Sequence, residues 1–420
     1  MKNSLLRNKS FVALISAQTI SSIGDWLSII AIFSLVGLRW EATPFEMSLV
    51  ILSMALPMAV MGTVGGVIAD RVERKFLMVA SDVIRAILII IISFASNLYV
   101  IYICLFFTGL LSALFMPAKN GKLKEILSDT EIKPAMAISS MIDSGSKIIG
   151  PLLSGLLVTF VGIIPVFYID ALTFIVSAII IVLLPKGNFD TAAEHDTGKK
   201  KSFSHEIVLG FQFIRKNAFL FYGLMLLTIS LLVLQLADSQ IVILFREIEN
   251  ASPSLLGTAI TGTGTGMLVV GAILSKKNEY PAFLYIVLGV VGAGVSFASL
   301  AALTVYNTPL PFLWAPGIAF VAGLSGGLVF IPFQANVQVE TPVHMTGRVF
   351  GLINSIMMTA TIIGPILGGW LATEFGIIPT FIATGSLLAC IGSIAFLNRN
   401  RVERSDGVVT EGQRGTQARA

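Results

Sequence analysis

The stretch GVIADRVERK, residues 66–75, carries five charged side chains between two segments that are apolar enough to lie in lipid. Charge is scarce elsewhere, because charged residues make up 12% of the 420 and hydrophobic residues 55%. An ordinary soluble domain carries about a quarter of its residues as charges. Apolar runs of the roughly 20 residues that a helix needs to cross a bilayer recur on both sides of the stretch. The sequence therefore predicts an all-α integral membrane protein, with this decamer in one of its loops.

Twelve apolar segments are long enough to be transmembrane helices. The first follows the basic residues Lys2, Arg7 and Lys9, and it is too long for a signal-peptide core and lacks a small-residue cleavage site, so we expect it to be retained. The expected spans are residues 11–38, 47–68, 76–96, 98–117, 135–160, 165–185, 217–245, 254–274, 281–304, 311–333, 348–372 and 379–397.

Basic residues collect in alternate loops of this arrangement. With the N-terminus in the cytoplasm, the inner segments hold most lysines and arginines, Lys119 and Lys122 among them, and the outer loops hold only Arg39 and Arg246. Because short cytoplasmic loops are enriched in these residues, we expect a multi-pass protein with both termini in the cytoplasm. The same loop bias explains the net charge of +4, so nucleic acid is not an expected partner.

The two halves of the chain resemble each other. FMPAKNGKLKEIL at 115–127, followed by IIGPLLSG at 148–155, parallels FIPFQANVQVETP at 330–342, followed by IIGPILGG at 362–369. GVIADR at 66–71 has a weaker counterpart in GAILSK at 271–276. Similarity at a fixed offset indicates an internal duplication. Two six-helix repeats are the layout of secondary transporters, whose substrate site lies near the bilayer midplane.

Composition also predicts the boundaries of these repeats. The longest polar stretch inside the chain, which includes KGNFDTAAEHDTGKKKSFSHE, separates six spans from six, and the residues after the last span are rich in Arg, Gly and Thr. We expect an N-terminal six-helix half at 1–185, a cytoplasmic linker at 186–216, a C-terminal six-helix half at 217–397 and a disordered cytoplasmic tail at 398–420.

The loop at 66–75 resembles the pattern G-x-L-A-D-R-x-G-R-K of the major facilitator superfamily, with Ile68 and Glu73 as departures. The resemblance implies a latch that holds the cytoplasmic side in one conformational state; a loop that only sets topology is the alternative. Asp82 and Arg85, one i,i+3 step apart in the third span, are expected to support the motif as a structural pair. The residues assigned to the latch are Gly66, Asp70, Arg71, Arg74, Lys75, Asp82 and Arg85.

The fifth span carries a polar stripe. Ser139, Asp143, Lys147, Gly150 and Ser154 recur at intervals of three or four residues, which places them on one face of a helix. Because a lone charge at mid-membrane is costly, we expect Asp143 and Lys147 to pair and to face the bundle interior. Asp143 would titrate or contact substrate with Lys147 as its cation; a static ion pair that fixes packing is the alternative.

Three more acidic residues lie in apolar spans. Asp25, in SSIGDWLS, has no basic neighbour on its own helix, so it needs a distant partner or a proton unless nearby serines satisfy it. Gln235 and Asp238, an i,i+3 step apart in the seventh span, are candidate contributions of the second half to the cavity. Asp170 is expected near the outer surface, solvated or at a helix end.

Two proline motifs mark equivalent spans of the two halves. GPLLSG in the fifth span and GPILGG in the eleventh resemble the antiporter motif G-P-x-x-G-G of drug exporters, and small residues beside a proline also favour tight packing and a kink. The residues concerned are Gly150, Pro151, Gly155, Gly364, Pro365, Gly368 and Gly369.

Other chemistries have no support in the sequence. A Walker-type phosphate-binding motif is absent, and His195, His205 and His344 show no metal-ligand spacing with Cys or Glu. We therefore expect no cofactor, no metal and no enzymatic activity. The fourth span also lacks the arginine that many proton-coupled drug exporters of the superfamily carry.

GDW in the first span, SDVIRA in the third and the two proline motifs resemble the bacterial macrolide-efflux and siderophore-export branch of the superfamily. This resemblance implies a proton-driven exporter of macrolide-like amphiphilic small molecules in the bacterial cytoplasmic membrane, acting as a monomer. Its partners would be the substrate, protons and the lipid bilayer, with Asp25 and Asp143 as coupling carboxylates. A siderophore or lysophospholipid carrier is the alternative within transport, and a non-transporting membrane sensor is an alternative of another class.

Overall fold

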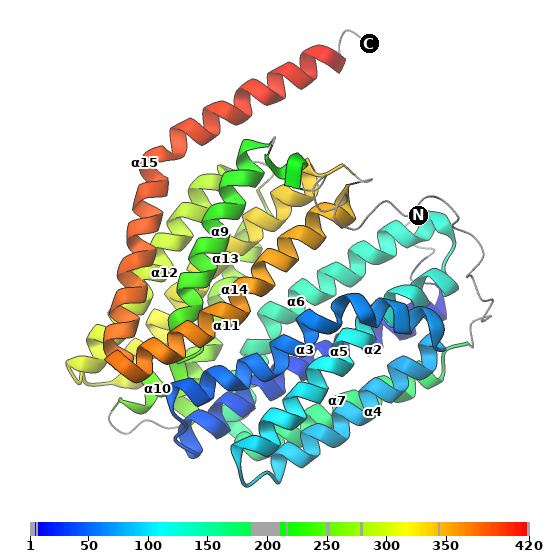
Figure 1. Ribbon diagram of the computed structural model, residues 1–420, viewed down its shortest axis with the longest axis horizontal. Coiled ribbons are helices and arrows are strands. Elements are labelled where there is room, and N and C mark those ends of the chain that lie inside the picture. The colour runs from blue at the N-terminus through cyan, green and yellow to red at the C-terminus, as the bar shows by residue number, and fades with distance from the viewer. Residues whose placement is uncertain are drawn as a thin grey trace. The chain divides into compact units, whose positions relative to one another are not determined.

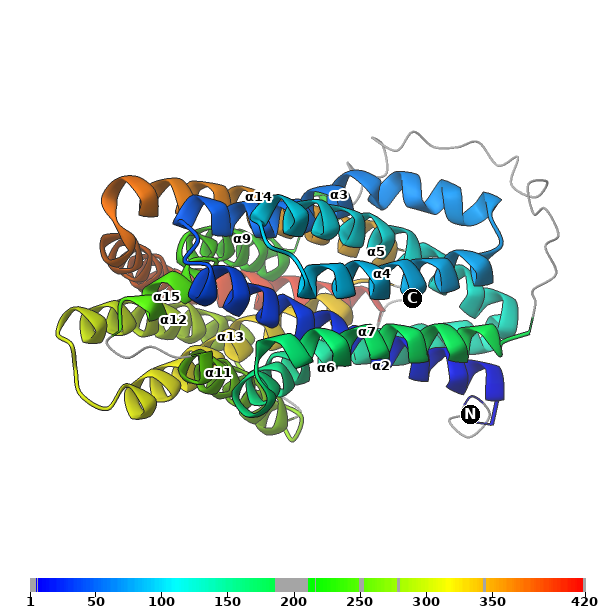
Figure 2. The ribbon, with the colours of Figure 1, turned by 90° about the horizontal axis from the view of Figure 1, so that it is seen from below.

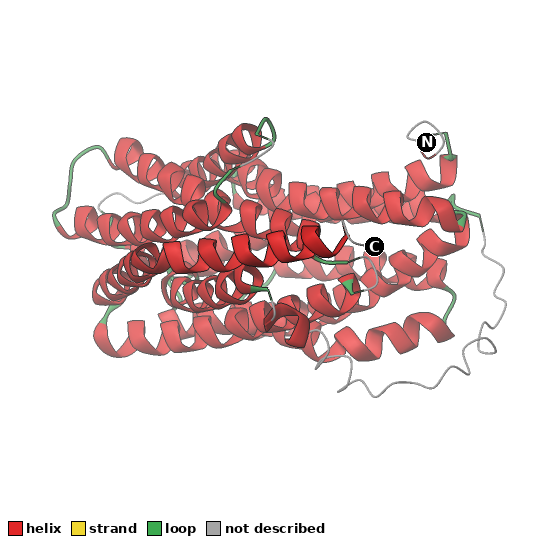
Figure 3. Ribbon diagram, turned by 90° about the horizontal axis from the view of Figure 1, so that it is seen from above, coloured by secondary structure: helices red, strands yellow, loops and turns green. Residues whose placement is uncertain are grey.

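The computed structural model describes residue 5 and residues 7–185, 211–215, 217–248, 253–277, 280–342 and 345–417. The described residues form helices joined by short loops, and no strand occurs among them (Figure 3). Twelve of the helical segments are long and apolar enough to cross a membrane. The predictions of an all-α membrane protein and of twelve spans are therefore confirmed. Most of the expected linker, residues 186–210 and 216, lies outside the described residues.

Six spans belong to the first half of the chain (Figure 1). The first span combines α2 (Lys9–Phe33) with a short π-helix, η1 (Ser34–Arg39). A capping box of Thr43 and Glu46 opens the next helix. The remaining helices are α3 (Pro44–Arg71), α4 (Arg74–Ser93), α5 (Leu98–Ile126), α6 (Asp129–Val161) and α7 (Ile163–Val182).

The other six spans follow in the second half. The seventh combines α9 (Ala218–Asp238) with the short α10 (Ile241–Arg246). The remaining helices are α11 (Pro253–Leu274), α12 (Ala282–Val305), α13 (Pro311–Glu340), α14 (Thr346–Phe375) and α15 (Ile377–Gln417).

Contacts divide the chain into two compact units. One contains α2 to α7 and also residues 245–264, and the other contains α9, the rest of α11 and α12 to α15. The first half of α11 joins the first unit because Gly257 lies so close to Gly155 of α6 that a side chain on either residue would overlap the other helix. These units differ from the expected boundaries, which placed all residues after 217 in one half.

The same helix pairs recur inside each unit, as an internal duplication requires. In the first unit α2 packs on α6 and α7, and α4 packs on α5 and α7, as Figure 2 shows for these neighbours. In the second unit α9 packs on α14 and α15, and α12 packs on α13 and α15. The first, third, fourth, fifth and sixth spans of each half therefore have corresponding partners.

α4 illustrates how these helices face lipid and protein. Its large apolar side chains Ile84, Ile87 and Ile91 are exposed, whereas its charged residues Asp82 and Arg85 are fully buried. In a membrane the exposed face meets hydrocarbon, and a charge is tolerated only where other helices supply partners. The polar face of α4 therefore marks the interior of the first unit.

Several helices extend beyond the expected spans. α5 continues to Ile126, about two turns past the expected end at 117, so Lys119 and Lys122 lie on a helix and are buried rather than solvated in a loop. α15 continues to Gln417, which corrects the expectation of a disordered tail as far as that residue. The physical reason is that the spanning helix supplies a nucleus, and the segment after it contains no proline to stop propagation.

Candidate functional site

An arginine lies at the centre of the first unit. Arg85 is 11 residues into α4, about 16 Å along the helix from its start, and only 3% of its side chain is exposed. Its Nη2 donates to Oδ1 of Asp82 one turn earlier, and Oδ2 of Asp82 accepts from the Ser177 hydroxyl of α7 at 2.6 Å. The expected pairing of Asp82 with Arg85 is therefore confirmed, and Asp82 is fully enclosed.

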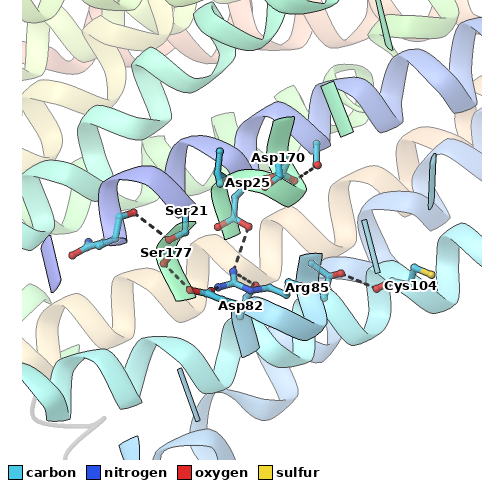
Figure 4. A network of polar contacts seen from close by, with 12 residues as sticks. Ser21, Asp25, Asp82, Arg85, Cys104, Asp170 and Ser177 are labelled. Atoms are coloured by element: carbon cyan, nitrogen blue, oxygen red, sulfur yellow. Dashed lines mark hydrogen bonds and ion pairs between the residues drawn. The ribbon is translucent and has the colours of Figure 1, made fainter. Parts of the chain in front are cut away.

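Arg85 also binds the first span, as Figure 4 shows. Its Nη1 lies 3.4 Å from Oδ1 of Asp25 and 3.4 Å from the Ser112 hydroxyl of α5. The guanidinium stacks near the rings of Phe115 and Phe174, at 5.0 and 4.4 Å from their centroids. Asp25 thus has the distant partner that the sequence required. The partners described for Asp82 and Arg85 belong to α2, α5 and α7 and not to the loop motif, so their assignment to the latch stays a prediction.

Asp170 completes a group of three acidic residues around this arginine. Its side chain is fully buried, and it accepts a hydrogen bond from the Ser28 hydroxyl of α2. The expectation that Asp170 is solvated near the outer surface is wrong. It lies seven residues into α7, about 10 Å along the helix, and there α7 packs against α2.

A second polar cluster joins α2, α5 and α6. Lys119 Nζ donates to the Ser139 hydroxyl at 3.0 Å and lies 3.7 Å from Oδ2 of Asp143. The Ser139 hydroxyl donates to Oε1 of Gln18 at 2.9 Å, and Nε2 of Gln18 donates to Oδ1 of Asp143 at 2.7 Å. The four side chains form a closed ring in which Lys119 and Gln18 are buried and Asp143 remains 30% exposed.

This ring corrects the expected partner of Asp143. Lys147 is exposed, and no ion pair joins it to Asp143 among the residues that the structure describes. The rest of the polar stripe does face α2, because Ser139 and Asp143 bind Gln18 and the Ser154 hydroxyl donates to the carbonyl of Leu27. Lys119 of α5 supplies the cation beside Asp143, while the Lys147 side chain is exposed.

The two proline motifs are close-packing surfaces. A side chain at Gly150 would overlap Trp26 of α2, and Pro151 follows as an interior helix proline. In the second unit Gly364 lies against Gln235 of α9, and Gly368 lies against the backbone of Leu236. Pro365 and the buried Gly369 belong to the same surface of α14. Gly150 therefore packs α6 on α2, and Gly364 and Gly368 pack α14 on α9, whereas Gly155 packs α6 on α11.

The loop motif is described in part. Gly66 and Asp70 lie in α3, but their side chains are outside the described part of the structure. Arg71 is exposed, and Arg74 forms an ion pair with Glu125 of α5 at 2.8 Å. Lys75 donates to the carbonyl of Leu184 at 2.6 Å, just after the end of α7. Arg74 and Lys75 thus join the start of α4 to the ends of α5 and α7.

The polar pair expected in the seventh span is not a cluster. Gln235 is half-buried against Gly364, whereas Asp238 is the last residue of α9 and its side chain is exposed. Within the described residues no hydrogen bond links the two side chains. The structure does not bring them together.

Three site residues were missed from sequence: Gln18, Lys119 and Ser177. A signal was present for two of them, because Gln18 precedes Asp25 by seven residues and Ser177 follows Asp170 by seven, so each pair shares a helix face. Lys119 gave no such signal. Its position after Pro117, among other lysines, is typical of a cytoplasmic loop.

Twelve membrane-spanning helices in two like halves, with charged side chains buried between helices, define a secondary-transporter type of membrane protein. Residues 14–360 match the Major Facilitator Superfamily. The chain belongs to this superfamily and is a multi-pass membrane transporter.

Relatives of known sequence extend over most of the chain. The MFS-type transporter YfiS of Bacillus subtilis (strain 168) is 38% identical over 427 residues, which cover 99% of this chain and 100% of YfiS. Macrolide efflux protein A of Streptococcus pyogenes is 27% identical over 365 residues, covering 83% of this chain and 87% of the relative. The multidrug efflux pump Tap of Mycobacterium bovis (strain BCG / Pasteur 1173P2) is 25% identical over 414 residues, covering 94% of each chain.

Solved structures share the fold at low identity. The nucleoside transporter NupG has a TM-score of 0.67 at 12% identity, covering 92% of this chain and 98% of NupG. A bacterial homolog of the human lysosomal transporter Spinster has a TM-score of 0.66 at 14% identity, covering 94% of this chain and 97% of that one. These similarities support the fold alone.

Proposed function

We propose that this protein is a proton-driven exporter of amphiphilic small molecules, macrolide-like drugs among them, that works by alternating access in the bacterial cytoplasmic membrane. Support for the cargo class comes from the relatives named for macrolide and multidrug efflux. Support for proton coupling comes from the interior of the first unit.

The proposal rests on the difference between the two ion pairs of Arg85, one with Asp82 and one with Asp25. Asp82 is fully buried and also bound by Ser177, so its contact with Arg85 is closed to water. Asp25 is 32% exposed and lies at 3.4 Å, so water can reach it and the contact is loose. Protonation of Asp25 would free one side of Arg85 without leaving the cation unpaired, which is what a proton-operated switch needs.

Asp143 is the second coupling carboxylate of the proposal, with Lys119 in the role first expected of Lys147. Its exposure of 30% leaves an oxygen accessible, while Gln18 and Lys119 hold it in place. Protonating Asp143 would weaken its attraction to Lys119 and loosen the link between α5 and α6. Because both switches act on contacts between helices of one unit, each can bias which side of the membrane is open.

The proposed orientation places both termini in the cytoplasm. In that orientation Arg74, Lys75 and Lys122 lie at cytoplasmic helix ends, as the preference of inner segments for basic residues requires. The loop motif would act as the conformational latch, and the working unit would be a monomer in lipid, with the substrate and protons as its partners.

Inside-out vesicles that carry the full chain test the proposal. The lumen is acidified, and uptake of a macrolide and of a fluorescent lipophilic cation is followed with and without a protonophore. We expect uptake that the protonophore abolishes and that Asp25→Asn and Asp143→Asn each reduce to the level of protein-free vesicles. Glu374→Gln is the matched control, since Glu374 is an exposed acid near the end of α14 and should leave uptake unchanged.

Each other outcome has a defined meaning. Uptake that resists the protonophore would refute proton coupling. No uptake of either compound by folded protein would refute the cargo class and lead next to siderophores and lysophospholipids, and then to a sensor without transport.

A further inference from the structure

Asp170 is the one acidic side chain of the first unit's interior that has no cation among its described partners. Its carboxyl group contacts two hydroxyl groups, the Ser28 hydroxyl of α2 and the Thr173 hydroxyl one turn along α7. Nη1 and Nη2 of Arg85 bind Asp25 and Asp82, its Nε has no hydrogen-bond partner among the described residues, and no hydrogen bond or ion pair is described between Arg85 and Asp170. A buried carboxylate with no cation is costly in a membrane interior.

The hydrogen bonds of Thr173 indicate that a proton on the Asp170 carboxyl group replaces the missing cation. The Thr173 hydroxyl has one proton, and its oxygen lies 2.7 Å from the carbonyl of Asp170, the better acceptor position. The same oxygen lies 3.2 Å from Oδ1 of Asp170. The single proton of the hydroxyl is directed mainly to the nearer carbonyl, so an ionised Oδ1 receives only a weak, shared bond from Thr173. A proton on Oδ1 would reverse this contact, with Oδ1 donating to the hydroxyl oxygen.

The other oxygen of the carboxyl group fits the same assignment. The Ser28 hydroxyl donates to Oδ2, which a neutral carboxylic acid accepts with its carbonyl oxygen. A neutral acid therefore satisfies both oxygens, one as a donor and one as an acceptor. An ionised Asp170 would be held by the Ser28 hydroxyl and by the shared proton of Thr173, with no cation bound to it among the described residues, which is a poor environment for a buried charge.

Gly24 shows that the fold leaves room for this arrangement. A Cβ atom at Gly24 would overlap both the Thr173 hydroxyl and Oδ1 of Asp170. The absence of a side chain at this position lets the Asp170–Thr173 contact lie directly against α2, beside Asp25 (Figure 4). In the GDW stretch, Gly24 makes room for the carboxyl group of Asp170, and the next residue, Asp25, carries a second carboxyl group. The two carboxyl groups therefore lie near each other at the surface of α2.

We propose that Asp170 is held as a neutral acid and stores a proton that it exchanges with Asp25. The charged and titratable groups that interact with it are Asp25 from α2 and Arg85 from α4, and Arg85 is itself bound to Asp82. From α6, Asp143 is bound to Lys119 and Lys147 is exposed, so neither neutralises Asp170.

The exchange conserves charge. In the proposed starting state, Asp25 and Asp82 are ionised, Arg85 is a cation and Asp170 is neutral, which sums to a charge of minus one. When the proton moves from Asp170 to Asp25, Asp25 becomes neutral, Asp170 becomes the anion and the sum is the same. Arg85, released from Asp25, is then the cation nearest to the new anion. The role of this proton in transport rests on the proposed function; the protonation of Asp170 does not.

Infrared spectroscopy of the purified full chain in lipid nanodiscs tests the protonation directly. At neutral pH the difference between wild type and Asp170→Asn should contain the carbonyl-stretch band of a protonated carboxylic acid. Asp82→Asn, which removes a buried but ion-paired carboxylate, is the matched control and should remove no such band. A wild-type difference spectrum without the band, or a band that Asp82→Asn removes instead, would overturn the assignment.

A second pair of variants covers the case in which Asp170→Asn does not fold. Thr173→Val removes the acceptor of the acid proton, so the band should shift to higher wavenumber, whereas Thr173→Ser keeps the hydroxyl and should leave it in place. An unshifted band in Thr173→Val would contradict the proposed hydrogen bond.

Vesicle uptake then separates the two proposals. If Asp170 exchanges the coupled proton, Asp170→Asn should abolish the protonophore-sensitive part of uptake while Asp170→Glu retains it. Wild-type sensitivity in Asp170→Asn would refute the exchange, even with the infrared band assigned. If wild type shows the band but no proton-driven uptake, the proposed function is refuted, whereas the assignment of Asp170 as a neutral acid still holds.

Discussion

Replacing Arg85 with methionine should destabilise the first unit strongly. Arg85 and Asp82 have side chains 3% and 0% exposed, so the change leaves Asp82 as a buried carboxylate without its cation. Removing one partner of a buried ion pair typically costs about 3–5 kcal/mol. The two aromatic contacts add little to the difference, because a methionine sulfur also packs well against rings, for about 0.3–1.5 kcal/mol. At about 1.4 kcal/mol per factor of ten, the unfolding equilibrium should shift by roughly two to three and a half powers of ten.

A double-mutant cycle in lipid nanodiscs measures this effect. Reversible unfolding is followed for wild type, Arg85→Met, Asp82→Asn and the double variant at neutral pH. The double variant should recover more than half of the loss, since a neutral side chain at residue 82 needs no cation. The loss in Arg85→Met should also shrink at acidic pH, where protonation removes the unpaired charge. A loss below about 1 kcal/mol, the order of ordinary hydrogen bonds between membrane helices, or a double variant no more stable than Arg85→Met, would refute the reasoning.

Three further changes have expected outcomes in thermal or denaturant unfolding. Lys119→Met should lower the free energy of unfolding by about 1–3 kcal/mol, because it removes a buried donor. Lys124→Met, at an exposed position, should change it by less than about 0.5 kcal/mol. Equal losses in the two variants would contradict the burial of Lys119. Gly368→Ala should lower the free energy of unfolding by about 1–3 kcal/mol, because the added methyl group overlaps the backbone of α9. Gly351→Ala on the same helix meets open space and should be neutral or stabilising by up to about 1 kcal/mol. A neutral Gly368→Ala would argue against the close contact. Lys147→Ala should leave both unfolding and vesicle uptake unchanged, and a loss of uptake would restore Lys147 to the site.

Burial of a charged residue could be anticipated only where its own helix supplied a pattern. Asp82 and Arg85 lie one turn apart in an apolar run, and that spacing predicted their ion pair correctly. Asp25 stood alone in its span, so a distant partner could be required but not named. Arg85 became that partner because α2 and α4 both pack on α7, and no property of either helix alone encodes this.

The failures share a physical cause. Lys147 was paired with Asp143 because an i,i+4 spacing brings side chains together on an isolated helix, but α5 lies beside Asp143 and Lys119 takes its place. Lys119 and Asp170 were assigned to solvated ends because polar residues near a span boundary usually are. α5 continues beyond its apolar run and carries Lys119, and Asp170 is a buried residue of α7. In both cases the side chain contacts another helix instead of water.

The sequence alone determined the membrane class, the twelve spans, the duplication and the location of the proline motifs, because each depends on local hydropathy or on repetition along the chain. The tertiary structure decided which charges meet. Only the packing of α2, α4 and α7 places Asp25, Asp82 and Asp170 around a single arginine, and only Gly24 lets Asp170 approach α2. Hydropathy is a property of a segment, whereas an ion pair between helices is a property of two surfaces whose register is set by close packing.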